Sequence, residues 1–170
     1  MPVSHIVGID PGLVHTGVIR LMLSEGEITV EHTVVAGLDV AAVEEWVGSL
    51  GPWPDRIFIE KYDPRMHYST DERMVKGEAM LKGALRNSVL LRNTGIKQTV
   101  PLAVLSVLGL DSFTTRTHHQ DLLSAARIAV LGCMKDPDLN KEVAEAVRDK
   151  LDGFPWPVND LGGGLYVTTE

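Results

Sequence analysis

Three acidic side chains that lie far apart in the sequence occupy positions from which they could hold a divalent metal ion. Asp10 and Glu60 each end a short apolar run, and Asp121 lies in the first turn of an expected helix, where His118, three residues earlier, shares its face. Carboxylates that share a site repel one another unless a cation joins them. Hard oxygen ligands select Mg²⁺ or Mn²⁺. Two such ions about 4 Å apart can activate water and stabilise the leaving oxygen in phosphodiester cleavage.

Each of these residues also has a purely structural interpretation. Asp10 precedes Pro11-Gly12 and could close an Asx turn. Glu60 could pair with a nearby Lys or Arg, Asp121 could complement the helix dipole, and His118 could be a surface residue of the first turn. Only the strand and helix contexts taken together favour one common site.

Strand and helix patterns predict the scaffold of that site. Alternating apolar residues predict strands over 5–10, 15–23 and 28–35, joined by short turns as an antiparallel meander. Asp39 is a plausible N-cap for a helix to about residue 50, and a short strand over 56–59 ends on Glu60. If the strands that end at Asp10 and Glu60 are parallel neighbours, both carboxylates meet at the edge where open α/β sheets bind ligands.

The second half of the chain is expected to be mainly helical. A capping box at Ser69-x-x-Glu72 opens a long helix that Asn93-Thr94-Gly95 ends, and Gly77 and Gly83 within it suggest a close approach by another helix or a ligand. A fifth strand is expected over 96–100, a short helix over 101–108, a helix from a capping box at Thr117-x-x-Gln120 to about residue 132, and a last helix after Asp136-Pro137. This order predicts an α/β fold: a mixed five-stranded sheet, three antiparallel strands followed by β-α units, with helices on both faces.

Composition indicates one domain in a reducing cytoplasm. Residues 1–135 are expected to form the domain, with the helix and tail of 136–170 packed on it and 154–170 mobile or loosely docked. Cys133 is the only cysteine and is expected to be a small core residue. The sequence has no apolar run of about 18 residues and no signal-peptide pattern, so no membrane partner is expected.

Positive charge is concentrated in one segment of an acidic chain. The net charge is −7, yet residues 60–97 hold eight basic and five acidic residues, a net charge of +3. Such a band could follow a phosphate backbone, or could simply be a solvated helix face. On the first interpretation Lys61, Arg65, Arg73, Lys76 and Lys82 are the expected DNA contacts.

The motifs together resemble a known family. Gly8-Ile9-Asp10-Pro11-Gly12 with Thr16-Gly17, then Ile59-Glu60, then His118-x-x-Asp121 with Ala125-Ala126, are similar to the RuvC family of Holliday junction resolvases, which have the ribonuclease H-like fold. The resemblance covers about residues 5–132 and is closer to phage-type or otherwise divergent members. One departure is that the stretch 100–115 has no Lys or Arg where typical members carry a lysine-rich loop.

The resemblance implies a function. Asp10, Glu60 and Asp121 would be metal-binding catalytic carboxylates for two Mg²⁺ or Mn²⁺ ions, and His118 would take the fourth catalytic position. The chain would be a homodimeric, metal-dependent endonuclease that resolves four-way DNA junctions, with the long central helix contributing to the dimer. Alternatives are a flap or fork nuclease, an actin-like or sugar-kinase-like ATP-binding protein, and a non-catalytic DNA-binding protein. The chain length disfavours the ATP-binding protein, and the three acids disfavour the non-catalytic one.

Overall fold

A computed structural model describes residues 3–24, 27–63, 71–113, 117–151, 156–160 and 163–167, with side chains to residue 144. The strands are β1 (Ser4–Asp10), β2 (His15–Ser24), β3 (Glu27–Ala36), β4 (Arg56–Glu60), β5 (Ser88–Leu91), β6 (Trp156–Asp160) and β7 (Gly163–Val167). The helices are α1 (Val40–Ser49), α2 (Glu72–Ala84), α3 (Ile96–Thr99), α4 (Leu102–Val107), α5 (His119–Lys135) and α6 (Pro137–Leu151).

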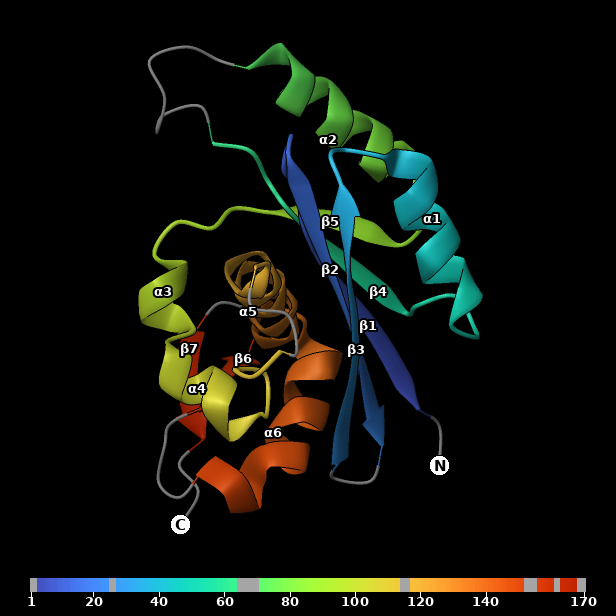
Figure 1. Ribbon diagram of the computed structural model, residues 1–170. Coiled ribbons are helices and arrows are strands. Elements are labelled where there is room, and N and C mark those ends of the chain that lie inside the picture. The colour runs from blue at the N-terminus through green and yellow to red at the C-terminus, as the bar shows by residue number, and fades with distance from the viewer. Residues whose placement is uncertain are drawn as a thin grey trace.

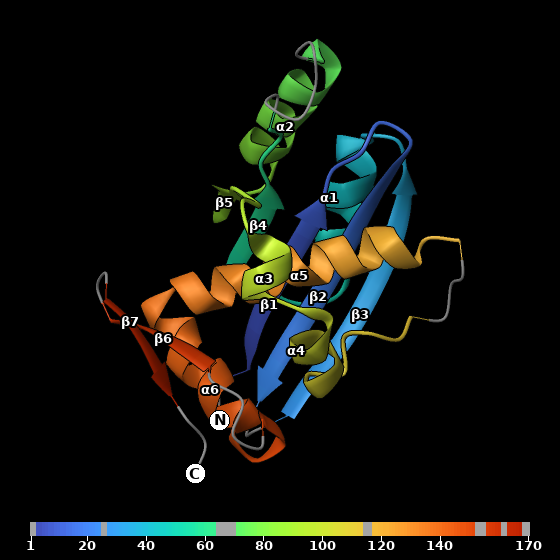
Figure 2. The same ribbon diagram turned by 90° about the vertical axis from the view of Figure 1, so that its left-hand side faces the viewer.

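The main sheet has five strands in the order β3-β2-β1-β4-β5. β1 pairs with β2 and β2 with β3 in antiparallel fashion, while β1 pairs with β4 and β4 with β5 in parallel. Helices α1 and α2 cover one face, and α5 crosses the other with α3, α4 and α6 around it (Figures 1 and 2). The predicted mixed five-stranded α/β fold is therefore confirmed.

Burial on both faces explains why β1 and β4 are almost wholly apolar. Val7, Ile9, Ile57 and Ile59 face α1 and α2, while Ile6 and Phe58 face α5. Helix α5 is buried around most of its circumference, as its apolar sequence requires. Cys133 is buried in this helix, where burial raises the pKa of its thiol, so the prediction of an inert core cysteine is confirmed.

A buried arginine connects β2 to the end of α1. The Arg20 side chain is fully buried and donates hydrogen bonds to the carbonyl oxygens of Val47 (3.1 Å) and Pro52 (2.6 Å). Its Nη2 also lies 2.9 Å from His5 Nδ1, which must accept this hydrogen bond. Carbonyl groups at the carboxyl end of a helix carry partial negative charge, which offsets part of the cost of burying this cation.

Four predicted parts of the chain differ from the structure. The long helix ends at Ala84, and the fifth strand is Ser88–Leu91; the segment 96–100 instead contains α3. Helix α5 has His118 rather than Thr117 as its N-cap, without a side-chain capping hydrogen bond, and extends to Lys135. The tail contains an antiparallel hairpin of β6 and β7, with β6 in contact with α6.

The other helix ends follow the expected chemistry. Asp39 caps α1 by accepting a hydrogen bond from Ala42 N, and Asp136 caps α6 by accepting from Leu139 N. Asp71 caps α2, whereas Ser69 of the predicted capping box lies outside the described residues. None of the helices in the described part of the chain has the length and apolar character that a membrane span requires.

Candidate active site

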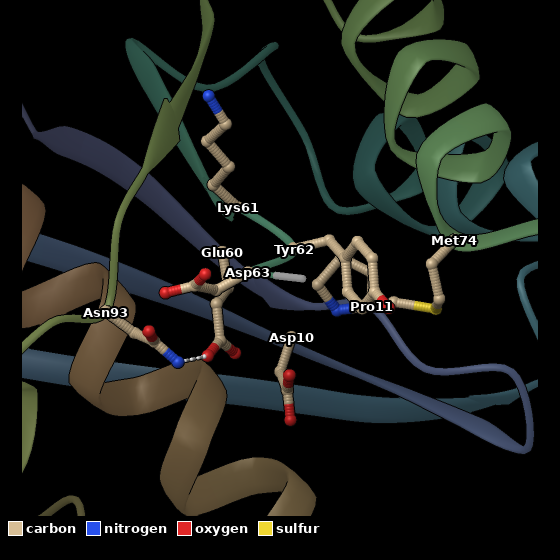
Figure 3. Close-up of a pocket in the computed structure, with 8 residues that line it drawn as sticks. All are labelled: Asp10, Pro11, Glu60, Lys61, Tyr62, Asp63, Met74 and Asn93. Carbon is tan, nitrogen blue, oxygen red and sulfur yellow. Dashed lines mark hydrogen bonds between the residues drawn. The ribbon is translucent and has the colours of Figure 1, made fainter. Parts of the chain in front are cut away.

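The parallel pairing of β1 with β4 brings Asp10 and Glu60 side by side. Ile9 pairs with Ile59, so the next residue of each strand lies at the same edge of the sheet. Both side chains line a pocket of about 170 Å³ (Figure 3). The sequence-based expectation that these two carboxylates meet at the strand ends agrees with this geometry.

The pKa of Asp10 records how crowded this edge is. Burial is the largest cause of a rise from an ordinary value of 3.8 to about 9, and the neighbouring Glu60 carboxyl and the negative charges of Glu60 and Asp121 contribute to the same rise. Asp10 therefore keeps a proton at neutral pH when no cation is present. Because the charge of Asp121 acts on Asp10, the third acid belongs to the same electrostatic cluster.

Two glycines let α5 lie close enough to the sheet to bring Asp121 to this edge. Gly17 pairs with Asp10 across β1 and β2, and a Cβ on Gly17 would lie 2.6 Å from the Asp121 carbonyl oxygen. A Cβ on Gly8 would clash with the Ala125 carbonyl one turn further along α5. Only glycine permits so close a backbone approach, which explains Gly8 and Gly17 of the sequence motif.

His118 lies beside Asp121 but is not hydrogen-bonded to it. Its Nδ1 is 3.5 Å from Asp121 Oδ2, and this buried nitrogen has no hydrogen-bond partner among the described residues. The His118 ring packs edge-on against the His15 ring, with centroids 4.3 Å apart. His15, which the sequence did not single out, therefore positions the ring of His118.

The turn between β1 and β2 holds Pro11 and Gly12 beside the carboxylates. The buried Thr16 hydroxyl donates to the Gly37 carbonyl at 2.7 Å and accepts a hydrogen bond from Gly12 N at 3.3 Å. These contacts hold the conformation of the turn that follows Asp10, the last residue of β1.

Asn93 is a further residue of the site that the sequence did not reveal. Glu60 pairs with Leu91 in β5, so the side chain of Asn93, two residues later, comes from the same edge of the sheet. Its Nδ2 donates a hydrogen bond to Glu60 Oε1, drawn as the dashed line in Figure 3. The sequence shows only a turn signal here, and it predicts the fifth strand after Asn93, over 96–100.

The carboxylates and the histidine are chemically suited to a hard divalent cation, although they are not arranged around one. Within the described residues, no three His, Cys, Asp or Glu side chains are grouped as ligands of one ion. Asp10 instead holds a proton, and a metal ion must displace that proton to bind. Clustered oxygen donors and an unpaired imidazole nitrogen nevertheless form a donor set that Mg²⁺ or Mn²⁺ would accept.

The expected DNA contacts are spread over two elements. Lys61 lines the pocket, but its side chain points away from the two carboxylates (Figure 3). Arg73, Lys76 and Lys82 are exposed on α2, and Arg73 is paired with Asp71 at 3.0 Å. Arg65 lies outside the described residues.

The corrected position of β5 changes the basic residues that flank the site. The segment between the fifth strand and α5 now begins at Arg92, so it includes Arg92 and Lys97, both exposed. These two cations lie between β5 and α5, a segment in which the stretch 100–115 has no Lys or Arg.

The fold and site together define a class: a mixed α/β sheet in the order β3-β2-β1-β4-β5, with acidic residues at the carboxyl ends of β1 and β4. Among solved structures, Thermus thermophilus RuvC is similar over 74% of this chain and 91% of that chain, with 19% identity and a TM-score of 0.54. T. thermophilus RuvC in complex with a Holliday junction substrate is similar over 74% and 90%, with 18% identity and a TM-score of 0.51. The resemblance to RuvC is thus confirmed at the level of the fold. No family model and no curated protein matches the sequence.

Proposed function

We propose that this chain is a metal-dependent endonuclease that hydrolyses phosphodiester bonds in branched DNA, with the four-way junction as its main substrate. The observation that carries the proposal is the pairing of Asp10 with Glu60 at neighbouring strand ends, within the electrostatic reach of Asp121. The similarity of the fold to that of RuvC, which has been solved with a Holliday junction, supports the choice of substrate.

Asp10, Glu60, Asp121 and His118 are the residues that would hold the metal ions. Bound Mg²⁺ or Mn²⁺, two ions per site, would supply a water of lowered pKa and stabilise charge on the leaving oxygen. Asn93 would hold Glu60 in orientation through its hydrogen bond. His118 would use its unpaired Nδ1 to bind an ion or to accept a proton, with its ring held by His15.

The exposed cations give the DNA backbone a path past the carboxylates. Arg73, Lys76 and Lys82 on α2 lie on one side of the pocket, which α2 reaches through Met74. Arg92 and Lys97 follow β5 beside Asn93. Phosphate contacts position a duplex without reading its sequence, so this basic set would set affinity and its salt dependence.

A homodimer would allow two symmetric cuts across one junction. Three large apolar side chains remain exposed on α2 and β5: Val75 (48%), Met80 (51%) and Val89 (44%). Gly83 on the same helix has open space where a Cβ would lie, unlike Gly77, whose Cβ would meet the Leu38 side chain. A second copy of α2 could cover this surface, which agrees with the contribution of the central helix to the dimer implied by the resemblance.

A junction cleavage assay tests the proposal. The purified chain is incubated with a labelled mobile four-way junction in Mg²⁺, Mn²⁺ or EDTA, beside a flap and a fork with the same arm sequences. We expect paired nicks in opposite strands of the junction that require the metal, and elution as a dimer in size-exclusion chromatography with light scattering. Equal cutting of flap and fork would favour the less selective nuclease, and absence of cutting with every substrate and metal would contradict the proposal.

A further inference from the structure

A second pocket adjoins the carboxylate pocket. It has a volume of about 620 Å³ and is lined by Asp63 and residues 93–98, the turn after β5 and most of α3. Asp63 and Asn93 line both pockets, so the two form one continuous depression. Pockets that hold small organic groups measure roughly 300–1,000 Å³, and the carboxylate pocket, at about 170 Å³, is smaller than that.

The side chains of the second pocket suit a nucleotide. Lys97 and Gln98 have no hydrogen-bond or ion-pair partner for their side chains among the described residues. A lysine ammonium pairs with phosphate, and a glutamine amide can donate to and accept from the edge of a base. Ile96 adds an apolar contact for the face of a base, and Asp63 can accept from an exocyclic amine but would repel a phosphate.

We propose that this second pocket is a subsite for the nucleotide next to the scissile phosphate. Lys97 contacts the phosphate of that nucleotide, and Gln98 contacts its base. The proposal rests on the proposed function, because continuity with the carboxylate pocket identifies the occupant as part of the cleaved strand and not a free nucleotide. Asn93 lines both pockets and donates a hydrogen bond to Glu60, so it is the residue through which a nucleotide in the subsite would contact the carboxylate site.

Fluorescence of a base analogue tests the subsite without depending on cleavage. Four-way junctions carry 2-aminopurine at single positions on either side of the cut, and Asp10→Asn in the otherwise complete chain prevents turnover. Entry of that base into the pocket separates it from its neighbours, so we expect its fluorescence to rise about twofold or more at one position. Adding Gln98→Leu, which keeps the size but removes the amide, should abolish the rise.

The phosphate contact is tested separately. Lys97→Ala should weaken junction binding and lower the slope of log affinity against log salt by about 1, as expected for one lost phosphate contact. Lys141→Ala removes the same charge from α6, away from both pockets, and serves as the matched control, for which neither change is expected.

Two patterns would overturn the subsite while leaving the proposed function intact. In the first, no base near the cut brightens although the wild-type chain cuts the junction. In the second, the fluorescence rise survives Gln98→Leu and the salt slope survives Lys97→Ala. A wild-type chain that neither binds nor cuts junctions would instead refute the proposed function, and the subsite with it.

Discussion

Replacing Asp10 by Asn should abolish cleavage and stabilise the fold at the same time. The folded carboxyl has a pKa of about 9, and the ordinary value that applies to the unfolded chain is 3.8. At pH 7 the folded state must therefore hold a proton that the unfolded state has released. Asparagine has nearly the same shape and carries no titratable proton, so it removes this cost.

The size and pH dependence of the effect follow from the two pKa values. Between pH 3.8 and about 9 the folded state binds more protons than the unfolded state, so the free energy of unfolding of the wild type falls as pH rises. The upper limit at pH 7 is about 4 kcal/mol, at 1.36 kcal/mol per pH unit. We expect a gain below that limit, of about 1–3 kcal/mol, or a Tm higher by about 3–10 °C.

Chemical denaturation from pH 4 to pH 8 in EDTA measures this difference. The advantage of Asp10→Asn should be absent near pH 4 and grow toward pH 8, while junction cleavage in Mg²⁺ is lost. Asp39→Asn is the matched control, because Asp39 caps α1 and Asn caps helices equally well. If Asp10→Asn is less stable than the wild type, or if its gain is constant with pH, then the protonated state of Asp10 is wrong. If the variant still cuts, the catalytic role of Asp10 is wrong.

Three other predictions follow from contacts around the site. Gly17→Ala should destabilise the fold by about 2 kcal/mol or more in denaturant titrations, because its Cβ would clash with the Asp121 carbonyl, whereas Gly83→Ala, with open space in the chain, should not. Asn93→Ala should lower kcat for junction cleavage about tenfold, the loss expected for one hydrogen bond to a charged group, with junction Kd nearly unchanged. Burial and the Arg20 charge lower the pKa of His5, so the free energy of unfolding should fall as pH drops below 6.5 through the folded pKa, a slope that His5→Gln removes.

The first half of the fold could be predicted because each of its signals is local. The alternation of apolar and polar residues predicts β2 and β3, and Asp39 predicts the start of α1. Two apolar runs that each end on an acidic residue predict β1 and β4. The parallel pairing of β1 with β4 was inferred from the order of elements, and it is this pairing that places Asp10 beside Glu60. Sequence order alone was therefore sufficient for the two central residues of the site.

The region around β5 could not be predicted because the spacing of its apolar residues fits both a helix, with a period of about 3.6, and a strand, with a period of about 2. Leu81, Leu85 and Val89 fit one face of a continuing helix, yet Val89 lies in a strand and is exposed. The helix ends before Asn87, whose positive φ of 64° is a conformation that asparagine tolerates better than most residues. Pairing with β4 makes Ser88–Leu91 a strand and not a continuation of the helix. The same pairing brings Asn93 within hydrogen-bonding distance of Glu60.

The arrangement of the carboxylates explains why Asp10 holds a proton in the absence of metal. The backbones are fixed: Asp10 lies opposite Gly17, and Gly17 touches the Asp121 backbone, so neither the sheet nor α5 needs to move to bring the three acids together. What differs from a metal site is the placement of the side chains, since Asp121 lies beside His118 and no three ligand side chains of the described residues are grouped around one ion. A divalent ion that neutralises the acids would lower the pKa of Asp10, so the carboxyl would release its proton. We therefore expect metal binding to require side-chain rotation and proton release, and so to strengthen as pH rises toward 9.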